Sequence, residues 1–269
     1  MNLKKALDFC TYYLRDKNID EADFKSLCLV CYVAKIKNSE FYLNQSREID
    51  ANALESLLLR LENGEPLQYI IGKWDFYESE FYVGKGVLIP RPETEELVEL
   101  AVSYAKKINE PVIYDLCSGS GCIGISIAKK ITDSKVFCIE KSEEAFEYLK
   151  KNANGVKNVT TILADINDDI DLPMADIIVS NPPYIKSKDI KGLQRELSFE
   201  PELALDGGSD GLDFYRIISE KYTSKLKNDG VFLFEIGNEQ GEDIKKLFKN
   251  ADILKDIYGN DRIAEIIKE

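Results

Sequence analysis

The sequence predicts an α/β protein in which a Rossmann-like domain, built on a mainly parallel sheet of seven strands, follows a small bundle of helices. Three observations support this fold class. Apolar residues recur at helical spacing through about the first 63 residues, a short hairpin pattern follows, and strand and helix patterns then alternate to the end of the chain. The length of 269 residues suffices for one large domain or two modest ones.

The N-terminal part of the chain predicts helices only. The first helix is indicated by apolar residues at helical spacing: Leu3, Ala6, Leu7, Cys10 and Leu14. A second apolar-rich segment runs to about Ile36, and Asp50 can cap a third helix that ends at Gly64. We expect these helices to form a small bundle over residues 1–72. Such a bundle serves either as a structural cap or as a substrate-docking domain, and the sequence does not separate the two.

Residues 73–92 predict a linker that contains a β-hairpin. Its polar turn, Glu78-Ser79-Glu80, is flanked by apolar residues: Trp74, Phe76, Phe81 and Val83. After an extended apolar segment, Glu93-Thr94-Glu95-Glu96 begins a helix that runs to about Lys107. Acidic residues stabilise the N-terminal end of a helix, which supports a start at this point. The second domain is therefore expected to span residues 93–269.

Strands and helices alternate after Pro111. The strands are predicted near residues 112–116, 135–139, 159–163, 175–180, 230–236, 252–257 and 262–267. The helices between them are predicted near residues 121–131, 142–153, 211–227 and 240–250. This alternation is typical of a parallel sheet that is covered on both faces. Only four residues, 258–261, separate the last two strands, which predicts an antiparallel hairpin and a mixed edge of the sheet.

The charge and hydropathy of the chain argue against several function classes. The net charge of −13 repels phosphate backbones, so no stable nucleic-acid binding is expected. No apolar run approaches the roughly 18 residues of a membrane span, and the N-terminus lacks the apolar core of a signal peptide. We expect a cytoplasmic monomer without a membrane partner.

The chain contains no histidine, so it lacks both the usual neutral-pH base and the commonest metal ligand. Cys28 and Cys31 have the C-x-x-C spacing of some zinc sites, but they lie in an apolar stretch and no second pair follows. Buried, reduced thiols are the favoured interpretation, and no metal site is expected.

A glycine-rich loop after the first strand of the sheet predicts a nucleoside-cofactor site. Gly119 and Gly121 allow tight turning and a close approach of the backbone to a ligand, although G-x-G-x-x-G spacing alone is weak evidence. Glu140 ends the second strand, where it can accept hydrogen bonds from ribose hydroxyls, and Asp165 ends the third, near an adenine ring. The expected cofactor-binding residues are Asp115, Cys117, Ser118, Gly119, Ser120, Gly121, Glu140, Asp165, Ile166 and Asn181.

The sequence Asn181-Pro182-Pro183-Tyr184 follows the buried strand predicted over residues 175–180. The prolines end the strand and stiffen the turn, so that Asn181 and Tyr184 project at the carboxyl edge of the sheet. The Asn181 side chain and the Pro182 carbonyl can grip a planar NH2 group, with the Tyr184 ring on its face. NAD accounts for the loop and the two acids only, whereas S-adenosylmethionine also accounts for this fourth feature.

Together these residues resemble the HemK-type peptide-chain release factor glutamine methyltransferases. The matching motifs are Glu65–Gly72, Leu88–Glu95, Asn181–Ile185, the stretch from Glu200 to Arg216, and Glu235–Gln240. The resemblance runs from about residue 65 to the C-terminus, and the helical N-terminal domain fits the bacterial members. The chain departs from the family at Cys117-Ser118, where Gly-Thr is common, and at Glu140, where Asp is also frequent.

The resemblance implies methyl transfer from S-adenosylmethionine, leaving S-adenosylhomocysteine, to the glutamine amide nitrogen in the Gly-Gly-Gln motif of class-1 release factors. Asn181, Pro182 and Tyr184 are the implied catalytic residues. The Asn181 side chain and the Pro182 carbonyl would accept the two amide protons, while Tyr184 packs against the amide. Pro183, Arg91 and Glu93 complete the expected substrate-binding set, although Arg91 and Glu93 could equally form an ion pair at the domain junction.

Two alternatives stay open at this point. Asn-Pro-Pro-Tyr is also similar to the loop of enzymes that methylate the amines of adenine or guanine in nucleic acids, which often flip the base into a stacking pocket. The acidic charge and the absence of an obvious basic stripe on the N-terminal helices count against that reading. The second alternative is a non-catalytic module that binds a release factor.

Overall fold

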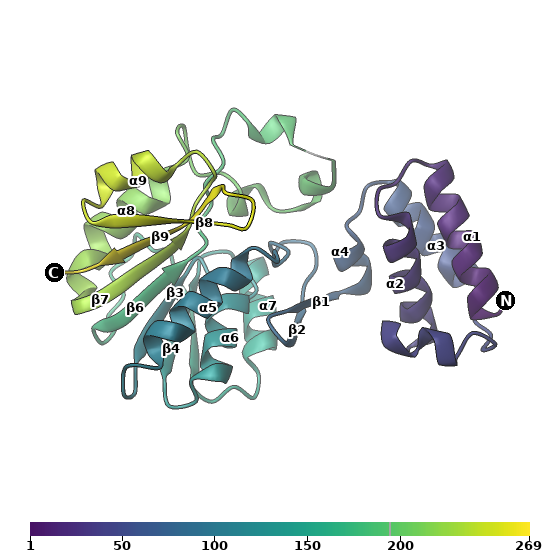
Figure 1. Cartoon of the computed structure of the whole chain (residues 1–269), viewed down its shortest axis with the longest axis horizontal. Coiled ribbons are helices and arrows are strands. Elements are labelled where there is room, and N and C mark those ends of the chain that lie inside the picture. Colours follow the sequence, from purple (N-terminus) through teal and green to yellow (C-terminus); the bar gives the residue numbers. More distant parts are fainter. Residues whose placement is uncertain (194) are drawn as a thin grey trace. The chain divides into compact units, whose positions relative to one another are not determined.

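The computed structural model describes residues 1–193 and 195–269, and the chain divides into two compact units (Figure 1). The first unit comprises Met1–Lys73 together with the short segment Arg195–Phe199, and the second is formed by the rest of the chain from Trp74 onward. Among the described residues, no helix has the length and apolar character that crossing a membrane requires.

The first unit is built mainly of helices, as predicted. Its α-helices are α1 (Leu3–Asp16), α2 (Ala22–Ala34), α3 (Ala51–Glu62) and the short α4 (Leu67–Ile71), and a 3-10 helix spans Asn38–Leu43. The side chain of Asn2 caps α1 by accepting from the Lys5 N–H at 2.9 Å, and Asp50 caps α3 through the Asn52 N–H at 3.0 Å. The predicted cap at Asp50 is therefore confirmed.

The second unit begins with a hairpin of β1 (Lys73–Phe76) and β2 (Ser79–Tyr82). The prediction of a hairpin is confirmed, but the predicted turn at residues 78–80 is wrong by one position. Tyr77 and Glu78 form the turn, with φ angles of +44° and +60°, and Ser79 already belongs to β2. Positive φ at both central residues of a two-residue turn matches the right-handed twist of the flanking strands.

The sheet of the second unit has the strand order β5-β4-β3-β6-β7-β9-β8 in the described part of the chain. Its strands are β3 (Val112–Leu116), β4 (Lys135–Glu140), β5 (Val159–Leu163), β6 (Ala175–Ser180), β7 (Leu226–Glu235), β8 (Ala251–Lys255) and β9 (Asp261–Ile267). The pairs among β3 to β7 are parallel, whereas β9 pairs antiparallel with both β7 and β8. The predicted mixed edge is confirmed.

Helices cover both faces of this sheet (Figure 1). They are α5 (Thr94–Ala105), α6 (Cys122–Lys130), α7 (Glu143–Ala153), α8 (Asp213–Tyr222) and α9 (Gly241–Leu247). The prediction that one helix spans residues 211–227 is wrong at both ends. Gly211 has a φ of +80°, which a helix does not allow, and Leu226 is buried in β7 opposite Ala175.

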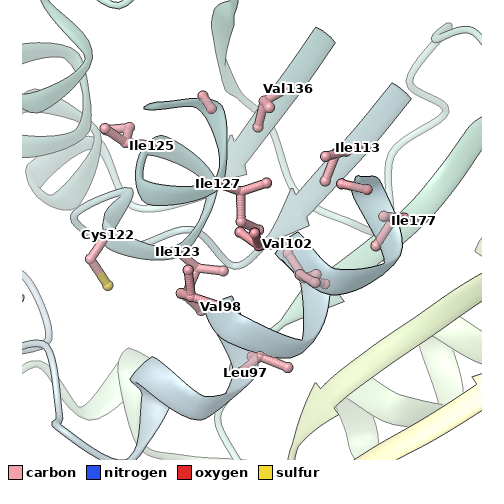
Figure 2. Close-up of a cluster of buried hydrophobic side chains, with 14 of the residues drawn as sticks. Leu97, Val98, Val102, Ile113, Cys122, Ile123, Ile125, Ile127, Val136 and Ile177 are labelled. Carbon is pink, nitrogen blue, oxygen red and sulfur yellow. The ribbon is translucent and has the colours of Figure 1, made fainter. Parts of the chain in front are cut away.

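The two faces of the sheet have separate apolar cores because side chains alternate along each strand. On β6, Ile177 contributes to the core beneath α5 and α6, whereas Ile178 contributes to the core beneath α8 and α9. Figure 2 shows the first core, where Leu97 and Val98 of α5 and Ile123 of α6 lie near the strand residues Ile113 and Ile177. Strands buried on both faces explain the nearly continuous apolar runs in the sequence.

Replacing Ile177 by alanine should lower the free energy of unfolding of the second unit by about 2–5 kcal/mol, because the side chain is fully buried and leaves a cavity. Trp74, the single tryptophan, packs in this unit and reports its unfolding by fluorescence in a urea titration. Ile267→Ala, at a position that is 48% exposed, serves as the control and should cost about 0.5 kcal/mol or less. Equal losses in the two variants would contradict this account of the core.

Candidate active site

A pocket opens at the carboxyl edge of the sheet, where the chain reverses the direction in which strands are added. From β3 the chain proceeds through β4 and β5 to one side, and β6 then pairs on the other side of β3. Open α/β sheets bind ligands at such a switch point because the loops after the two central strands separate there. The pocket has an empty volume of about 910 Å³, part of it open to solvent. Its described lining includes Ser118, Gly119, Glu140, Asp165 and Asn181, which brings most of the predicted site together.

The loop after β3 keeps its backbone close to this pocket. Among the residues that the structure describes, a Cβ atom added to Gly119, whose φ is +55°, would have only a Val87 methyl group within reach, at 4.0 Å, so the space beside it is open. A Cβ at Gly121 would instead lie 2.4 Å from Leu149 Cδ1. Gly121 is therefore required for packing against α7, whereas Gly119 leaves room for a ligand to touch the backbone.

Cys117 adopts a φ of +59°, a left-handed conformation that is rare for residues other than glycine. At this position the sequence departs from the glycine that is common in the resembling family. The structure supplies the physical reason for that glycine, because it adopts this conformation without steric cost. Cys117 keeps the loop geometry nonetheless, since the Ser118 N–H donates to the Ile139 carbonyl at 3.0 Å.

Glu140 is buried at the end of β4 and holds the loops on either side of it. Its carboxylate accepts from the Gly119 N–H at 2.8 Å through Oε2 and from the Ser142 N–H at 2.7 Å through Oε1. Burial raises the pKa of Glu140, and the backbone donors counteract part of that rise. Each carboxylate oxygen keeps a further lone pair, so Glu140 can also accept from the hydroxyls of a ribose.

Asp165 lies at the end of β5, beside Ile166, and both residues line the pocket. Its Oδ2 forms an ion pair with Lys141 Nζ at 2.7 Å, and its Oδ1 accepts from the Asn167 N–H at 2.9 Å. Burial alone would raise the pKa of Asp165, but Lys141 and the Asn167 N–H outweigh it and lower the pKa. The Lys141 partner was not foreseen from the sequence, and contact of Asp165 with an adenine ring stays a prediction.

Asp115 takes a different place from the one expected. It is fully buried in β3, and its Oδ2 accepts from the Gly124 N–H of α6 at 2.9 Å. A Cβ at Gly124 would lie 2.8 Å from that same carboxylate oxygen, which explains the glycine at this position. Asp115 is absent from the described lining of the pocket. It stabilises the glycine-rich loop through its hydrogen bond to the start of α6. Burial raises its pKa to about 7, against the lowering effect of the Gly124 N–H.

Asn181 is the first residue of the loop after β6, and it lines the pocket. Its Nδ2 donates to Thr94 Oγ1 at 3.2 Å, and Thr94 in turn donates to Glu235 Oε2 at 2.6 Å. Among the described residues, no group donates a hydrogen bond to Asn181 Oδ1 or to the Pro182 carbonyl oxygen, and Asn181 lines the pocket whereas Pro182 is buried outside its lining. Asn181 Oδ1 can therefore accept from an NH2 group in the pocket, and the matching role of the Pro182 carbonyl stays a prediction.

Tyr184 is more enclosed than the sequence suggested. Its ring packs against the second core and lies close to Gly237, while its carbonyl accepts from Gln240 Nε2 at 3.2 Å. Burial raises the pKa of its hydroxyl to about 12. The described pocket lining contains Pro183 but neither Pro182 nor Tyr184. Tyr184 thus anchors the loop, and its contact with a substrate amide stays a prediction.

Arg91 lines the pocket and forms an ion pair with Glu200, whose side chain is only 2% exposed. The other oxygen of Glu200 accepts from the Ile89 N–H at 3.0 Å, so one acid holds the segment before α5. Glu93, by contrast, is exposed and absent from the described lining. An ion pair at Arg91 was one of the two expectations, but its partner is Glu200 rather than Glu93.

The sequence reasoning assigned no site role to Thr94, Glu200 or Glu235, although all three lie within the quoted motifs. Glu235 is 2% exposed at the end of β7, and burial raises its pKa while the Thr94 hydroxyl and the nearby Arg262 lower it. The sequence did contain a signal for Glu235, because it is an acidic residue near the end of a strand that was predicted to be buried. A buried carboxylate needs hydrogen-bond donors, so Glu235 could have been predicted to bind polar side chains near the site.

Two family models match the chain. Residues 5–72 match the PrmC N-terminal domain, and residues 98–200 match the methyltransferase small domain. A release factor glutamine methyltransferase of Thermodesulfovibrio yellowstonii is 40% identical over 253 residues, covering 89% of this chain and 90% of that protein. The release factor glutamine methyltransferase of Clostridium acetobutylicum is 34% identical, covering 100% of this chain and 99% of that protein.

Among solved structures, the hMettl16 catalytic domain in complex with the MAT2A 3′UTR hairpin 6 has a TM-score of 0.59 to this chain. The match covers 93% of this chain and 82% of that one, at 11% sequence identity. At that identity the similarity is one of fold alone.

The buried Asp115 should make stability depend on pH. Its pKa of about 7 in the folded protein exceeds the value of about 3.9 in an unfolded chain. The folded state therefore binds more protons between these values, and stability falls as pH rises from about 4 to 7, by up to about 1.4 kcal/mol per pH unit. Asp115→Asn should show a shallower fall when urea unfolding is followed between pH 5 and 8.

The exposed Asp169 offers the matched control, and Asp169→Asn should keep the wild-type pH dependence. If Asp115→Asn and Asp169→Asn gave the same slope of stability against pH, the proton uptake would have to be assigned to another group.

Proposed function

The chain belongs to the release factor glutamine methyltransferase family, and we propose that it methylates the glutamine of the Gly-Gly-Gln motif in class-1 peptide chain release factors. The methyl acceptor is the side-chain amide nitrogen, and S-adenosylmethionine is the donor. The observation that carries the proposal is Asn181 Oδ1, an acceptor that has no donor among the described residues and lies at the pocket on the carboxyl edge of the sheet, followed in the chain by the Pro182 carbonyl.

The pocket fits this cofactor by its chemistry. The open space beside Gly119 allows a ligand to lie on the loop backbone, Glu140 offers acceptors for a ribose, and Asp165 and Ile166 follow at the next strand end. Ser118, Ser120 and Gly121 would shape the same loop around the ligand. When bound, S-adenosylmethionine supplies a methyl group on a positively charged sulfur, which departs as the neutral thioether of S-adenosylhomocysteine.

At the other end of the pocket, the residues after β6 must hold the substrate amide nitrogen, which is a weak nucleophile. The lone pair of an amide nitrogen is delocalised into its carbonyl, and the chain has no histidine to remove a proton. Asn181 and Pro182 accept one N–H each, which aims the nitrogen at the methyl group and stabilises the positive charge that develops on it. Methylation of this nitrogen would leave one amide proton to pass to water.

Other parts of the expected site act by enclosing the substrate. Arg91, held by Glu200, and Pro183 line the pocket beside Asn181. Tyr184 fixes the loop through its buried ring, and we propose that its exposed portion excludes water from the amide. The net charge of −13 suits a basic partner surface and cytoplasmic work on a translation factor, with little affinity for nucleic acid.

Asn181→Ala should lower the turnover of methyl transfer by about 100-fold or more, because the amide loses one of its two acceptors. Binding of S-adenosylmethionine, followed by calorimetry, should change far less. The assay uses labelled S-adenosylmethionine with a purified release factor, the same factor carrying Gln→Ala in its Gly-Gly-Gln motif, and ribosomal RNA in parallel.

Label on the wild-type factor that is lost with its Gln→Ala variant is the expected result. Label on RNA alone would favour the nucleic-acid amine methyltransferase instead. An absence of any cofactor binding would favour a non-catalytic module that holds the release factor, and unchanged turnover in Asn181→Ala would remove the role assigned to that residue.

Glu140→Gln should weaken binding of S-adenosylmethionine by about tenfold, because a charged acceptor for the ribose hydroxyls becomes neutral. Calorimetric titration measures this directly. Glu143→Gln, at an exposed position at the start of α7, is the matched control and should bind as the wild type does. Equal affinities in the two variants would place the ribose elsewhere.

A further inference from the structure

We infer that Thr94 is a positioning residue for Asn181, and that Glu235 determines which way the Asn181 amide faces. The inference deepens the proposed function and rests on it, since it explains how the acceptor oxygen of Asn181 is presented to the substrate. It concerns three residues from separate segments: the start of α5, the loop after β6, and the end of β7.

The fold brings these three segments together at one edge of the sheet. β6 and β7 are parallel neighbours in which Ser180 pairs with Phe234. Asn181, which directly follows β6, and Glu235, the last residue of β7, come next along the two chain segments. Thr94 joins them from the first turn of α5 and is 2% exposed, as is Glu235. The hydrogen bonds of 3.2 Å and 2.6 Å therefore form a short chain that is shielded from water on the side of Glu235.

The direction of donation in this chain follows from counting protons. A threonine hydroxyl carries one hydrogen, and Thr94 donates it to Glu235 Oε2. Thr94 Oγ1 then presents only lone pairs to Asn181. The Asn181 amide must therefore turn its NH2 toward Thr94, and its Oδ1 faces away from it.

The orientation matters because the two ends of an Asn side chain have opposite hydrogen-bonding character. With Oδ1 available, Asn181 accepts an N–H of the substrate amide. With the amide reversed, an NH2 group would meet the substrate's own N–H, and two donors repel one another. Thr94 and Glu235 thus select the productive one of two nearly isosteric orientations before the substrate binds.

Thr94 also lines the pocket, so a direct contact with substrate is the competing explanation. A double-mutant cycle separates the two. If Thr94 acts through Asn181, then Thr94→Val loses its effect once Asn181 is alanine. If Thr94 instead touches the substrate or merely stabilises the fold, the fold-losses in kcat caused by Thr94→Val and Asn181→Ala should multiply in the double variant.

The experiment measures kcat, KM for the release factor and cofactor affinity in Thr94→Val, Thr94→Ser, Asn181→Ala and the Thr94→Val/Asn181→Ala double variant. We expect Thr94→Val to lower kcat about tenfold with cofactor affinity within about twofold, and Thr94→Ser, which keeps the hydroxyl, to retain most of the turnover. The double variant should turn over as Asn181→Ala does. Thr223→Val is the control, since it removes a hydroxyl bond of 2.7 Å to Ser219 on the far side of the unit and should behave as wild type.

Glu235→Gln provides a second route should Thr94→Val fold poorly. A glutamine both donates and accepts, so it no longer dictates the direction of the Thr94 hydroxyl, and kcat should again fall without a further loss in the Asn181→Ala background. Multiplicative losses, or wild-type kcat in Thr94→Val and Glu235→Gln, would overturn the inference while leaving the role of Asn181 intact. Wild-type turnover in Asn181→Ala would instead remove the role of Asn181 on which the inference rests, whereas a release factor that takes up no label from the wild-type enzyme would overturn the proposed function.

Discussion

The parallel pairing of β3 with β6 is the constraint on which the site depends. The chain leaves β3 toward β4 and β5 and returns on its other side, so the loops after β3 and β6 part at the carboxyl edge of the sheet. The Ser180 hydroxyl reinforces this junction by donating to the Leu116 carbonyl at 2.6 Å, at the last pair of the ladder. In the proposed function one loop faces the nucleoside and the other the substrate amide, and the distance between the loops is set by neighbouring strands.

Buried acids hold the loops around this junction. Asp115 accepts from the backbone of α6, Glu140 from the backbone on both sides of β4, and Glu200 from the segment before α5. Burying a carboxylate is costly unless donors compensate for the lost water, and here most donors are backbone N–H groups of the site loops themselves. A loop that moved away would leave its buried carboxylate without a hydrogen-bond donor. The free-energy cost of burying the acid therefore opposes movement of the loop.

In the mechanism that we propose for this chain, which has no histidine, methylation of the amide depends on oriented acceptors and not on a base that removes a proton. The Pro182 carbonyl belongs to a backbone stiffened by two prolines, and the Asn181 amide is held by Thr94 and Glu235. In the proposed mechanism both acceptors are thus oriented in advance, which lowers the reorganisation needed when charge develops on the nitrogen.

The sequence by itself determined the order of the helices and strands, the mixed edge of the sheet, and the loops that form the site. Those features follow from local patterns such as apolar runs, caps and prolines, which act over a few residues. Only the tertiary structure decided which side chains meet, as in the contacts of Asn181 with Thr94, of Thr94 with Glu235, and of Arg91 with Glu200. These partners are 87, 141 and 109 residues apart in the chain. Contacts over such separations depend on strand order and register, which no local pattern encodes.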